Sequence, residues 1–463
     1  MDKFINRKRE LKSLQDFWKN QNPQLVVIYG KRRVGKTELI KKFIEGKPDI
    51  YFLSDNLPES MNLKFLGRVV GEFFEDNFLI ESGFKDWYQF FQYLKDNVKK
   101  RMVLAIDEFP YLAHANKAIS SVFQKGWDEY LSDLPIFLIL CGSSISMMES
   151  ETLAYKAPLY GRRTGQLLIK PLSFSGASQF FPGKSMEDCL RFYTIAGGIP
   201  AYLKQLNTHL SPRKNIVNEI LSPDKLLYNE VEFILKEELR EPRNYFSILK
   251  AIAFGRNKFG EIVNETGIEK SSLHKYLFVL ENLQLIEKEI PVTEKNPIRS
   301  RKGCYRLQDQ FVKFWFSYVF PFKSELELGN TAPVLKKLKE SFNILVAQTY
   351  EKVTQEILRA HGDDFFLFMR VGRWWDKNEE IDLVALNDET NEILFGEAKW
   401  SNKKVGTNIY RDLKRKASLV DWGKPDRKEY FCLFSRSDFT EEMRRVAKEE
   451  RVFLFEKDKL KKC

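Results

Sequence analysis

The stretch that decides the fold is Leu25 to Lys42, LVVIYGKRRVGKTELIKK. Its apolar start predicts a short strand over 25–29, and the loop GKRRVGKT then leads into a helix predicted to open at Glu38. The loop matches G-x-x-x-x-G-K-[ST] with a strand before it and a helix after it, which is the context that this motif requires. We therefore expect a nucleotide-binding loop at this point of the chain.

Each position of the loop has a chemical reason. The two glycines let backbone N–H groups curl around phosphate oxygens, and the N-terminus of the following helix adds partial positive charge. Lys36 is expected to reach the β- and γ-phosphates of ATP, and the Thr37 hydroxyl is expected to bind Mg²⁺. The loop residues expected to contact the nucleotide are Gly30, Lys31, Arg32, Arg33, Val34, Gly35, Lys36, Thr37 and Glu38.

A second apolar run, MVLAIDE at residues 102–108, ends in two carboxylates. Ligands collect at the carboxyl ends of strands in an α/β sheet, so Asp107 is expected to face the phosphates and to bind Mg²⁺. Glu108 is placed to orient or deprotonate an attacking water. A further buried strand is predicted over 136–144, IFLILCGSS, where Ser143 either reads the γ-phosphate or simply ends the strand.

The basic segment LYGRRTG, residues 159–165, precedes a last short strand over 167–169. Arg162 or Arg163 could stabilise charge during phosphoryl transfer, within this chain or toward a neighbouring subunit of a homo-oligomer. The alternative is a solvated basic turn. Strands alternate with helices throughout this part, which predicts an α/β domain with a mostly parallel sheet.

The composition limits the other possibilities. The chain has 463 residues, of which 43% are hydrophobic and 30% charged, as in soluble globular proteins. We expect a cytoplasmic protein without membrane association, because no apolar stretch follows Met-Asp-Lys and no run reaches the length of a membrane span. The five cysteines form no CxxC pair and there are only four histidines, so any metal should be held by oxygen, as Mg²⁺ is.

The net charge points toward a polyanionic partner. Lysine and arginine number 75 against 64 aspartate and glutamate residues, which gives +11 at pH 7. A basic balance of this kind favours nucleic acid as a partner, although it is not specific by itself.

The chain carries, in this order, FINRKREL, GKRRVGKT, LAIDEFPYL, ILCGSS, YGRRTGQ and GGIPAYL. Together these segments resemble the archaeal-type P-loop ATPases, which are related to the AAA+ and STAND groups. The resemblance covers roughly residues 1 to 230. It implies that Phe4, Asn6, Arg7 and Pro200 lie near the base of the nucleotide. This chain has Asn6-Arg7 where members of the family often carry Gly-Arg.

Helical periodicity after the sheet predicts two further modules. Residues 173–239, interrupted at GGIP, are expected to form a helical lid over the nucleotide. Residues 240–322 hold three short helices around a Gly-containing turn, which is the helix-turn-helix signature, here of a winged-helix domain. The basic residues expected in the wing are Lys295, Arg299, Arg301, Lys302 and Arg306. The residues that could read DNA are Ser271, Ser272, His274 and Lys275, although such a module can also be a rigid connector.

The remaining residues are expected to form a linker over 323–340 and a last domain over 341–463. A helix over 341–360 should carry Glu351, and a strand is predicted over 365–369. A hairpin is predicted next, from EIDLVA at 380–385 and ILFGEAK at 393–399.

The hairpin brings together residues that could bind a metal. Side chains alternate along a strand, so Glu397 and Lys399 share one face, and Asp382 on the partner strand can meet Glu397 there. Two carboxylates and an ammonium group at a strand end can hold Mg²⁺ and activate water against a phosphodiester.

GRWWDKNEEIDLVA followed by ILFGEAKW resembles the PD-(D/E)xK nuclease superfamily. The resemblance implies a metal site of Glu351, Asp382 and Glu397, with Lys399 as a catalytic residue. A basic face downstream could track a phosphate backbone and comprises Lys403, Lys404, Arg411, Lys414, Arg415 and Lys416. The alternative is a solvated hairpin whose charged residues pair with one another.

The predicted fold is α/β: a P-loop NTPase parallel sheet over 1–172, a helical lid, a winged-helix domain and a C-terminal α/β nuclease-like domain. The function expected first is an ATP- and Mg²⁺-dependent enzyme in which nucleotide state gates processing of nucleic acid, DNA rather than RNA. The alternative is a nucleotide-switched regulator or scaffold, whose last domain binds nucleic acid or protein without cleavage.

Overall fold

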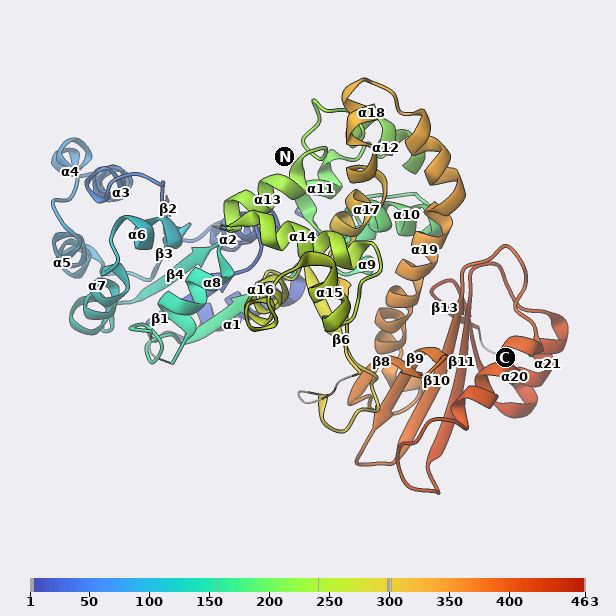
Figure 1. Cartoon of the computed structure of the whole chain (residues 1–463). Helices are drawn as coiled ribbons and strands as arrows, with labels where there is room; N and C mark the ends of the chain where they lie inside the picture. The colour runs from blue at the N-terminus through green and yellow to red at the C-terminus, as the bar shows by residue number, and fades with distance from the viewer. Residues whose placement is uncertain (1–3, 156, 240, 298–299, 301, 462–463) are drawn as a thin grey trace. The chain divides into compact units, whose positions relative to one another are not determined.

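The computed structural model describes residues 4–155, 157–239, 241–297, 300 and 302–461. They form two compact units (Figure 1). The first contains the described residues up to Leu172 together with Ile199–Ala201, and the second contains Ser173–Gly198 and the described residues from Tyr202 onward. Within the described ranges, no helix is both long enough and apolar enough to cross a bilayer.

A five-stranded parallel sheet forms the centre of the first unit, in the order β2-β3-β4-β1-β5. Its strands are β1 (Gln24–Tyr29), β2 (Asp49–Leu53), β3 (Met102–Asp107), β4 (Ile136–Gly142) and β5 (Gly165–Leu168). Every residue of β1, β3 and β4 is buried, because helices cover both faces and the strands can be apolar throughout. The predicted mostly parallel α/β sheet is confirmed, and β4 pairs with both β1 and β3.

Helices pack on both faces of this sheet. Leu25 and Val27 of β1 share one core with residues of the helices between β2 and β3. On the opposite face, Phe137 of β4 contacts the rings of Trp18 and Phe43. The helices are α1 (Lys8–Lys19), α2 (Lys36–Ile44), α3 (Glu59–Phe74), α4 (Asn77–Ser82), α5 (Trp87–Asn97), α6 (Phe109–Ala115), α7 (Ile119–Gly126) and α8 (Ile145–Met148), with π-helical turns η1 (Trp127–Leu131) and η2 (Glu149–Leu153).

The second unit begins with helices and a small sheet. The helices that precede the small sheet are α9 (Phe174–Ser178), α10 (Met186–Ala196), α11 (Pro200–Gln205), α12 (Pro212–Glu219), α13 (Glu230–Glu238), α14 (Pro242–Ala253), α15 (Phe259–Thr266) and α16 (Lys270–Asn282). The antiparallel strands β6 (Ile286–Glu289) and β7 (Cys304–Leu307) follow α16. Glu269 precedes the first turn of α16, and Ser271 lies within that turn. Arg299 and Arg301 lie outside the described residues.

The segment predicted as a linker over 323–340 is largely helical. After α17 (Gln310–Tyr318) and a 3₁₀ turn η4 (Phe320–Phe322), this segment contains α18 (Lys323–Glu327) and the first turns of α19 (Ala332–Ala360). The single long helix replaces the shorter one expected to start at 341. Pro333 suits the first turn of a helix, and buried Val334 and Leu338 extend its apolar face toward the N-terminus.

The C-terminal part of this unit is a mixed six-stranded sheet, in the order β13-β12-β11-β10-β9-β8. Its strands are β8 (Arg370–Asp376), β9 (Glu379–Asn387), β10 (Glu392–Lys399), β11 (Lys428–Ser435), β12 (Phe453–Glu456) and β13 (Lys459–Lys461). The predicted hairpin is confirmed as the antiparallel pair β9 and β10, and β10 pairs in parallel with β11. Figure 1 shows α19 on one side of this sheet, with α20 (Thr407–Ala417) and α21 (Glu441–Glu450) on the other.

The strand predicted over 365–369 is wrong, because β8 begins only at Arg370. The apolar run before it packs its rings instead of joining the ladder. Phe365 lies against Phe453, with ring centroids 4.3 Å apart, and Phe366 lies 5.3 Å from Tyr430. An apolar run that pairs as a strand and one that only packs its rings have the same composition. Which of the two forms therefore depends on the register of the neighbouring strand.

The first glycine of the phosphate loop provides a test of this packing. Gly30 has φ 153°, and a Cβ added there would lie 2.3 Å from the carbonyl oxygen of Ile169. We expect Gly30→Ala to destabilise the first unit by more than about 2 kcal/mol, measured by urea unfolding. Gly161→Ala is the matched control, because nothing lies within 4 Å of its added Cβ. Equal unfolding midpoints for the two variants would contradict this close approach.

Candidate functional site

The phosphate loop has the backbone that its motif requires. Gly30, Arg33 and Gly35 have φ of 153°, 66° and 91°. Helix α2 begins at Lys36 and not at Glu38 as predicted. Gly35, the residue before it, has a left-handed conformation, so the helix starts directly after this glycine. The N–H groups of the first turn of α2 therefore face the same space as those of the loop.

Lys36 is buried and folded back over its own loop. Its Nζ donates to the carbonyl oxygens of Gly30 and Lys31 at 3.0 and 2.9 Å. These two contacts hold the ammonium group over the loop, where the motif places a phosphate chain. Lys31 is buried as well, whereas Arg32 of the same loop donates to the hydroxyl of Tyr111 at 3.3 Å.

Asp107, at the end of β3, is fully buried and meets the first turn of α2. Its Oδ2 accepts hydrogen bonds from Thr37 Oγ1 at 2.6 Å and from the hydroxyl of Tyr51 at 2.8 Å. Burial and the Asp107 carboxylate raise the pKa of Tyr51 well above its usual range, so the phenol stays a donor. Tyr51 was missed from the sequence, because only the strand order makes it a neighbour of Asp107.

Glu108 and Ser143 lie together, as their positions at the ends of neighbouring strands predict. The backbone N–H of Ser143 donates to Glu108 Oε2 at 3.2 Å, and the Ser143 hydroxyl donates to Oε1. Glu108 itself has φ 54°, a left-handed conformation that is uncommon outside glycine. Such conformations persist where the surroundings hold them, and they concentrate at functional sites.

These side chains form a set of oxygen ligands suited to Mg²⁺. The Thr37 hydroxyl and the Asp107 carboxylate are in direct contact at 2.6 Å, at the point where the loop meets the end of β3. Mg²⁺ is bound in nucleotide sites by one or two such oxygens, with substrate phosphates and water completing the shell. The residues present therefore fit the ion.

The N-terminal segment reaches the loop from the side of Val34. Asn6 and Arg7 both have left-handed φ, 63° and 65°. Asparagine tolerates this conformation better than most residues, so it can stand where the related family often has glycine. The guanidinium of Arg7 is buried and donates to the carbonyl oxygen of Val34 at 2.8 Å. Burial lowers the pKa of Arg7, against the nearby Glu10.

Pro200 lies on the same side of the loop, since a Cβ added at Gly35 would be 3.8 Å from its Cγ. Phe4 is half-buried, ahead of α1. The first segment, the loop and Pro200 thus belong to one compact unit, as the resemblance implies.

Arg162 forms an ion pair with Asp128. Its Nε and Nη2 donate to the carboxylate of Asp128 at 2.8 to 3.0 Å. Arg163 donates to the carbonyl oxygens of Thr152 and Leu153 at 2.9 and 3.1 Å. Arg162 would have to leave Asp128 to reach a phosphate, so its role in phosphoryl transfer stays a prediction.

In the C-terminal sheet, Asp382, Glu397 and Lys399 lie together across β9 and β10. Asp382 Oδ2 accepts from the backbone N–H of Ala398 at 3.1 Å. Lys399 Nζ donates to Glu397 Oε1 at 2.6 Å. The other oxygen of Glu397, Oε2, is buried and accepts no hydrogen bond from the described residues. A buried carboxylate oxygen of this kind is suited to a cation.

The charges of this cluster perturb one another. Burial, and then the Asp382 carboxylate, raise the pKa of Glu397. Although burial alone would lower it, the Glu397 carboxylate raises the pKa of Lys399. Burial, followed by Asp382, raises the pKa of Glu351 in α19 to about 7. Perturbed carboxyl groups beside a lysine are frequent in active sites, although ion-pair networks also produce them.

The metal site expected at Glu351, Asp382 and Glu397 stays a prediction. Across the part of the chain that the structure describes, no three His, Cys, Asp or Glu side chains converge closely enough to hold a metal ion. The ion pair of Glu397 with Lys399 and the backbone contact of Asp382 use oxygens that such a site would need. A cation here would depend on Asp382 and Glu397, with the remaining ligands supplied by water or substrate.

The predicted basic face on and near α20 is largely paired with carboxylates. Lys404 pairs with Asp438, Arg411 with Glu442, and Lys414 with Glu450; Arg415 pairs with Glu379 and Asp412, and Lys416 with Asp412. A phosphate backbone would have to compete with these carboxylates, so the role of this face in binding nucleic acid stays a prediction. In α16, His274 stacks on Phe259 at 4.3 Å, whereas Ser271 and Lys275 are exposed.

Residues 4–206 match a family described as an ATPase domain predominantly from Archaea. Residues 315–409 match a family described as archaeal and bacterial proteins of unknown function. An uncharacterized protein of Methanocaldococcus jannaschii is 39% identical over 438 residues, which cover 94% of this chain and 95% of that protein. An uncharacterized ATP-binding protein of the same organism is 54% identical over 44 residues, 10% of this chain and 75% of that protein.

Among solved structures, the Walker-type ATPase of Pyrococcus abyssi matches 68% of this chain and 96% of its own, with 21% identity and a TM-score of 0.51. This likeness concerns the fold. The parallel sheet, the loop and the facing carboxylate define a P-loop ATPase domain. The chain belongs to the same family as the full-length M. jannaschii relative, with an archaeal ATPase domain followed by a C-terminal mixed-sheet domain.

The raised pKa of Glu351 predicts a pH-dependent stability. Its pKa rises from 4.5 to about 7 on folding, so the folded protein binds the proton more tightly, and stability is lost as pH rises between these values. We expect Glu351→Gln, which mimics the protonated form, to raise the thermal unfolding midpoint at pH 8 and to have a smaller effect at pH 5.

Glu340→Gln on the same helix is the matched control, because its side chain is exposed. An equal gain for Glu351→Gln at both pH values would contradict a carboxyl group that ionises between them.

Proposed function

We propose that the first unit binds and hydrolyses ATP with Mg²⁺. The observation that carries the proposal is the contact between Thr37 and Asp107 at the end of the phosphate loop. Thr37 and Asp107 would hold Mg²⁺, which neutralises charge on the phosphates when bound. Lys36 leaves the loop carbonyls to contact the β- and γ-phosphates, since phosphate oxygens carry more charge than carbonyl oxygens.

Glu108 orients and deprotonates the attacking water in this proposal. Its hydrogen bonds with Ser143 hold the carboxylate at the edge of the sheet where β3 and β4 end. A nucleotide that engages the Ser143 hydroxyl would release one oxygen of Glu108 for the water. Arg7, Phe4 and Pro200 flank the adenine.

Two variants separate binding from hydrolysis. We expect Lys36→Ala to weaken ATP binding by at least about tenfold in calorimetry, because a charged contact to the phosphates is lost. We expect Glu108→Gln to bind ATP normally and to lower the turnover number by about 10²- to 10⁴-fold, because the general base is removed.

Glu72→Gln is the control for both measurements, since Glu72 is exposed on α3. Unchanged ATP turnover in Glu108→Gln would remove Glu108 from the mechanism, and unchanged affinity in Lys36→Ala would remove the loop.

We further propose that the C-terminal sheet is a nuclease-like domain acting on nucleic acid, with DNA as the first substrate to test. Its support is the buried, unsatisfied Glu397 Oε2 beside Asp382 and Lys399. Asp382 and Glu397 would hold a divalent cation, which stabilises charge on a phosphodiester when bound. Residues 173–239 are proposed as the lid, and residues 240–322 as a winged helix that connects the lid to this domain.

Cleavage is tested directly on labelled single-strand, duplex and branched DNA with Mg²⁺ or Mn²⁺, with and without ATP. We expect Asp382→Asn and Lys399→Gln each to lower cleavage by about a hundredfold or more while ATP turnover is kept. Asp421→Asn is the control, because Asp421 is exposed.

The second candidate function is a nucleotide-switched regulator whose last domain binds nucleic acid or protein without cutting. It is favoured by the paired charges on α20 and by the absence of three converging metal ligands among the described residues. If the unmodified chain cleaves neither DNA nor RNA under these conditions, this second function replaces the first.

A further inference from the structure

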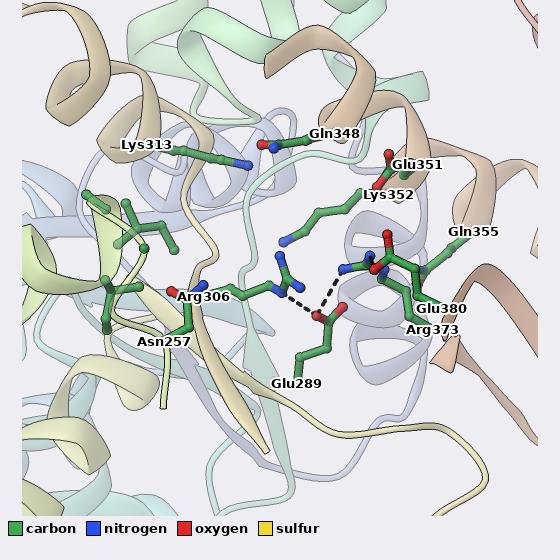
Figure 2. A pocket seen from close by; sticks show the side chains of 14 residues that line it. Asn257, Glu289, Arg306, Lys313, Gln348, Glu351, Lys352, Gln355, Arg373 and Glu380 are labelled. Carbon is green, nitrogen blue, oxygen red and sulfur yellow. Dashed lines mark hydrogen bonds and ion pairs between the residues drawn. The ribbon is translucent and has the colours of Figure 1, made fainter. Parts of the chain in front are cut away.

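A cavity of about 410 Å³ lies in the second unit, and Glu351, which belongs to the charged cluster beside the hairpin, is one of the residues that line it. Its walls come from α14, the small sheet β6–β7, α17, α19 and the first strands of the mixed sheet (Figure 2). Ligand-binding cavities commonly measure about 300 to 1,000 Å³, so this one can hold a ligand of nucleotide size.

Three cations converge on the cavity. Figure 2 shows the amino groups of Lys313 and Lys352 and the guanidinium of Arg306 directed into it. Burial, and then the charges of Lys352 and Arg306, lower the pKa of Lys313 to about 8, while the carboxylates of Glu351 and Glu287 act in the opposite direction. Like charges held this close are costly unless an anion lies between them.

Two of the three carboxylates that line the cavity, Glu289 and Glu380, form ion pairs, and the charge of the third, Glu351, raises the pKa of Lys313. Glu289 pairs with Arg306 at 2.5 Å and with Arg373 at 3.6 Å, and Arg373 pairs with Glu380 at 2.8 Å. Lys352 pairs with Glu287. Among the described residues, no carboxylate forms an ion pair with Lys313, so its ammonium group can accept a new anionic partner without breaking a pair.

The rest of the lining suits a base or a sugar. Ile252 and Leu307 provide apolar surface, and the amides of Asn257 and Gln348 provide groups of the kind that pair with base edges. In Figure 2 the Gln348 amide and the Lys313 amino group lie at the same end of the cavity.

We propose that this cavity binds a nucleotide through its phosphate group, as a second site distinct from the phosphate loop. Lys313, Lys352 and Arg306 contact the phosphate, and the apolar and amide wall contacts the nucleoside. The phosphate belongs to a free nucleotide or to the terminal phosphate of a nucleic-acid strand, and the two sources are distinguished by experiment.

The test uses the full chain carrying Lys36→Ala, which silences the phosphate loop, in calorimetry with three probes: AMP, 5′-phosphorylated dithymidine and inorganic phosphate. We expect one equivalent of AMP or of the dinucleotide to bind more tightly than inorganic phosphate. Adding Lys313→Gln should weaken this binding by at least about tenfold, and Lys313→Arg should keep it. Preference for AMP identifies a free nucleotide, and preference for the dinucleotide identifies a strand end.

Lys336→Gln is the matched control, since Lys336 is exposed on α19. Lys313→Gln should fold, because it removes a half-buried charge, and its thermal unfolding midpoint checks this. Binding that is unaffected by Lys313→Gln, no binding of any probe, or equal binding of all three overturns the proposal. Failure of the phosphate loop is separable: unmodified and Lys36→Ala chains would then bind ATP equally, while the effect of Lys313→Gln would persist.

Discussion

The hydrogen bond between Thr37 and Asp107 is the contact on which the ATPase domain depends. It joins two segments 70 residues apart and fixes the start of α2 against the end of β3. It can form only because β4 lies between β1 and β3, so that three parallel strands end at one edge. Gly30 contributes to the same edge of the sheet, because it has no side chain and the loop can therefore pack against Ile169, next to β5.

The second unit is governed by the cost of burying charge. Asp382, Glu397 and Lys399 form one cluster. Burial and the neighbouring charges of this cluster shift the pKa values of Glu397 and Lys399. One oxygen of Glu397 stays unsatisfied, which distinguishes this cluster from the fully paired surface of α20. Lys313 differs in the same way from Arg306 and Arg373 of its cavity, because these arginines form ion pairs and Lys313 forms none among the described residues. In both places the group without a partner points to a ligand.

Much of the fold followed from local pattern. The loop motif, the apolar strands ending in Asp107 and Ser143, and the hairpin that aligns Asp382 with Glu397 depend on short-range spacing, and the structure agrees with them. Two differences between prediction and structure have one cause. The linker over 323–340 and the strand over 365–369 are predicted from local pattern alone, whereas α19 and the ring contacts of Phe365 depend on packing partners elsewhere in the chain.

The sequence by itself determined the phosphate loop, its strand and helix, and the chemistry that Lys36, Thr37, Asp107 and Glu108 can supply, because these depend on residue type and spacing. Only the tertiary structure decided which charges meet. It brought Tyr51 to Asp107, turned Arg162 toward Asp128, and left Lys313 without an ion pair among the described residues. Such encounters join residues far apart in the chain, and no local pattern encodes them.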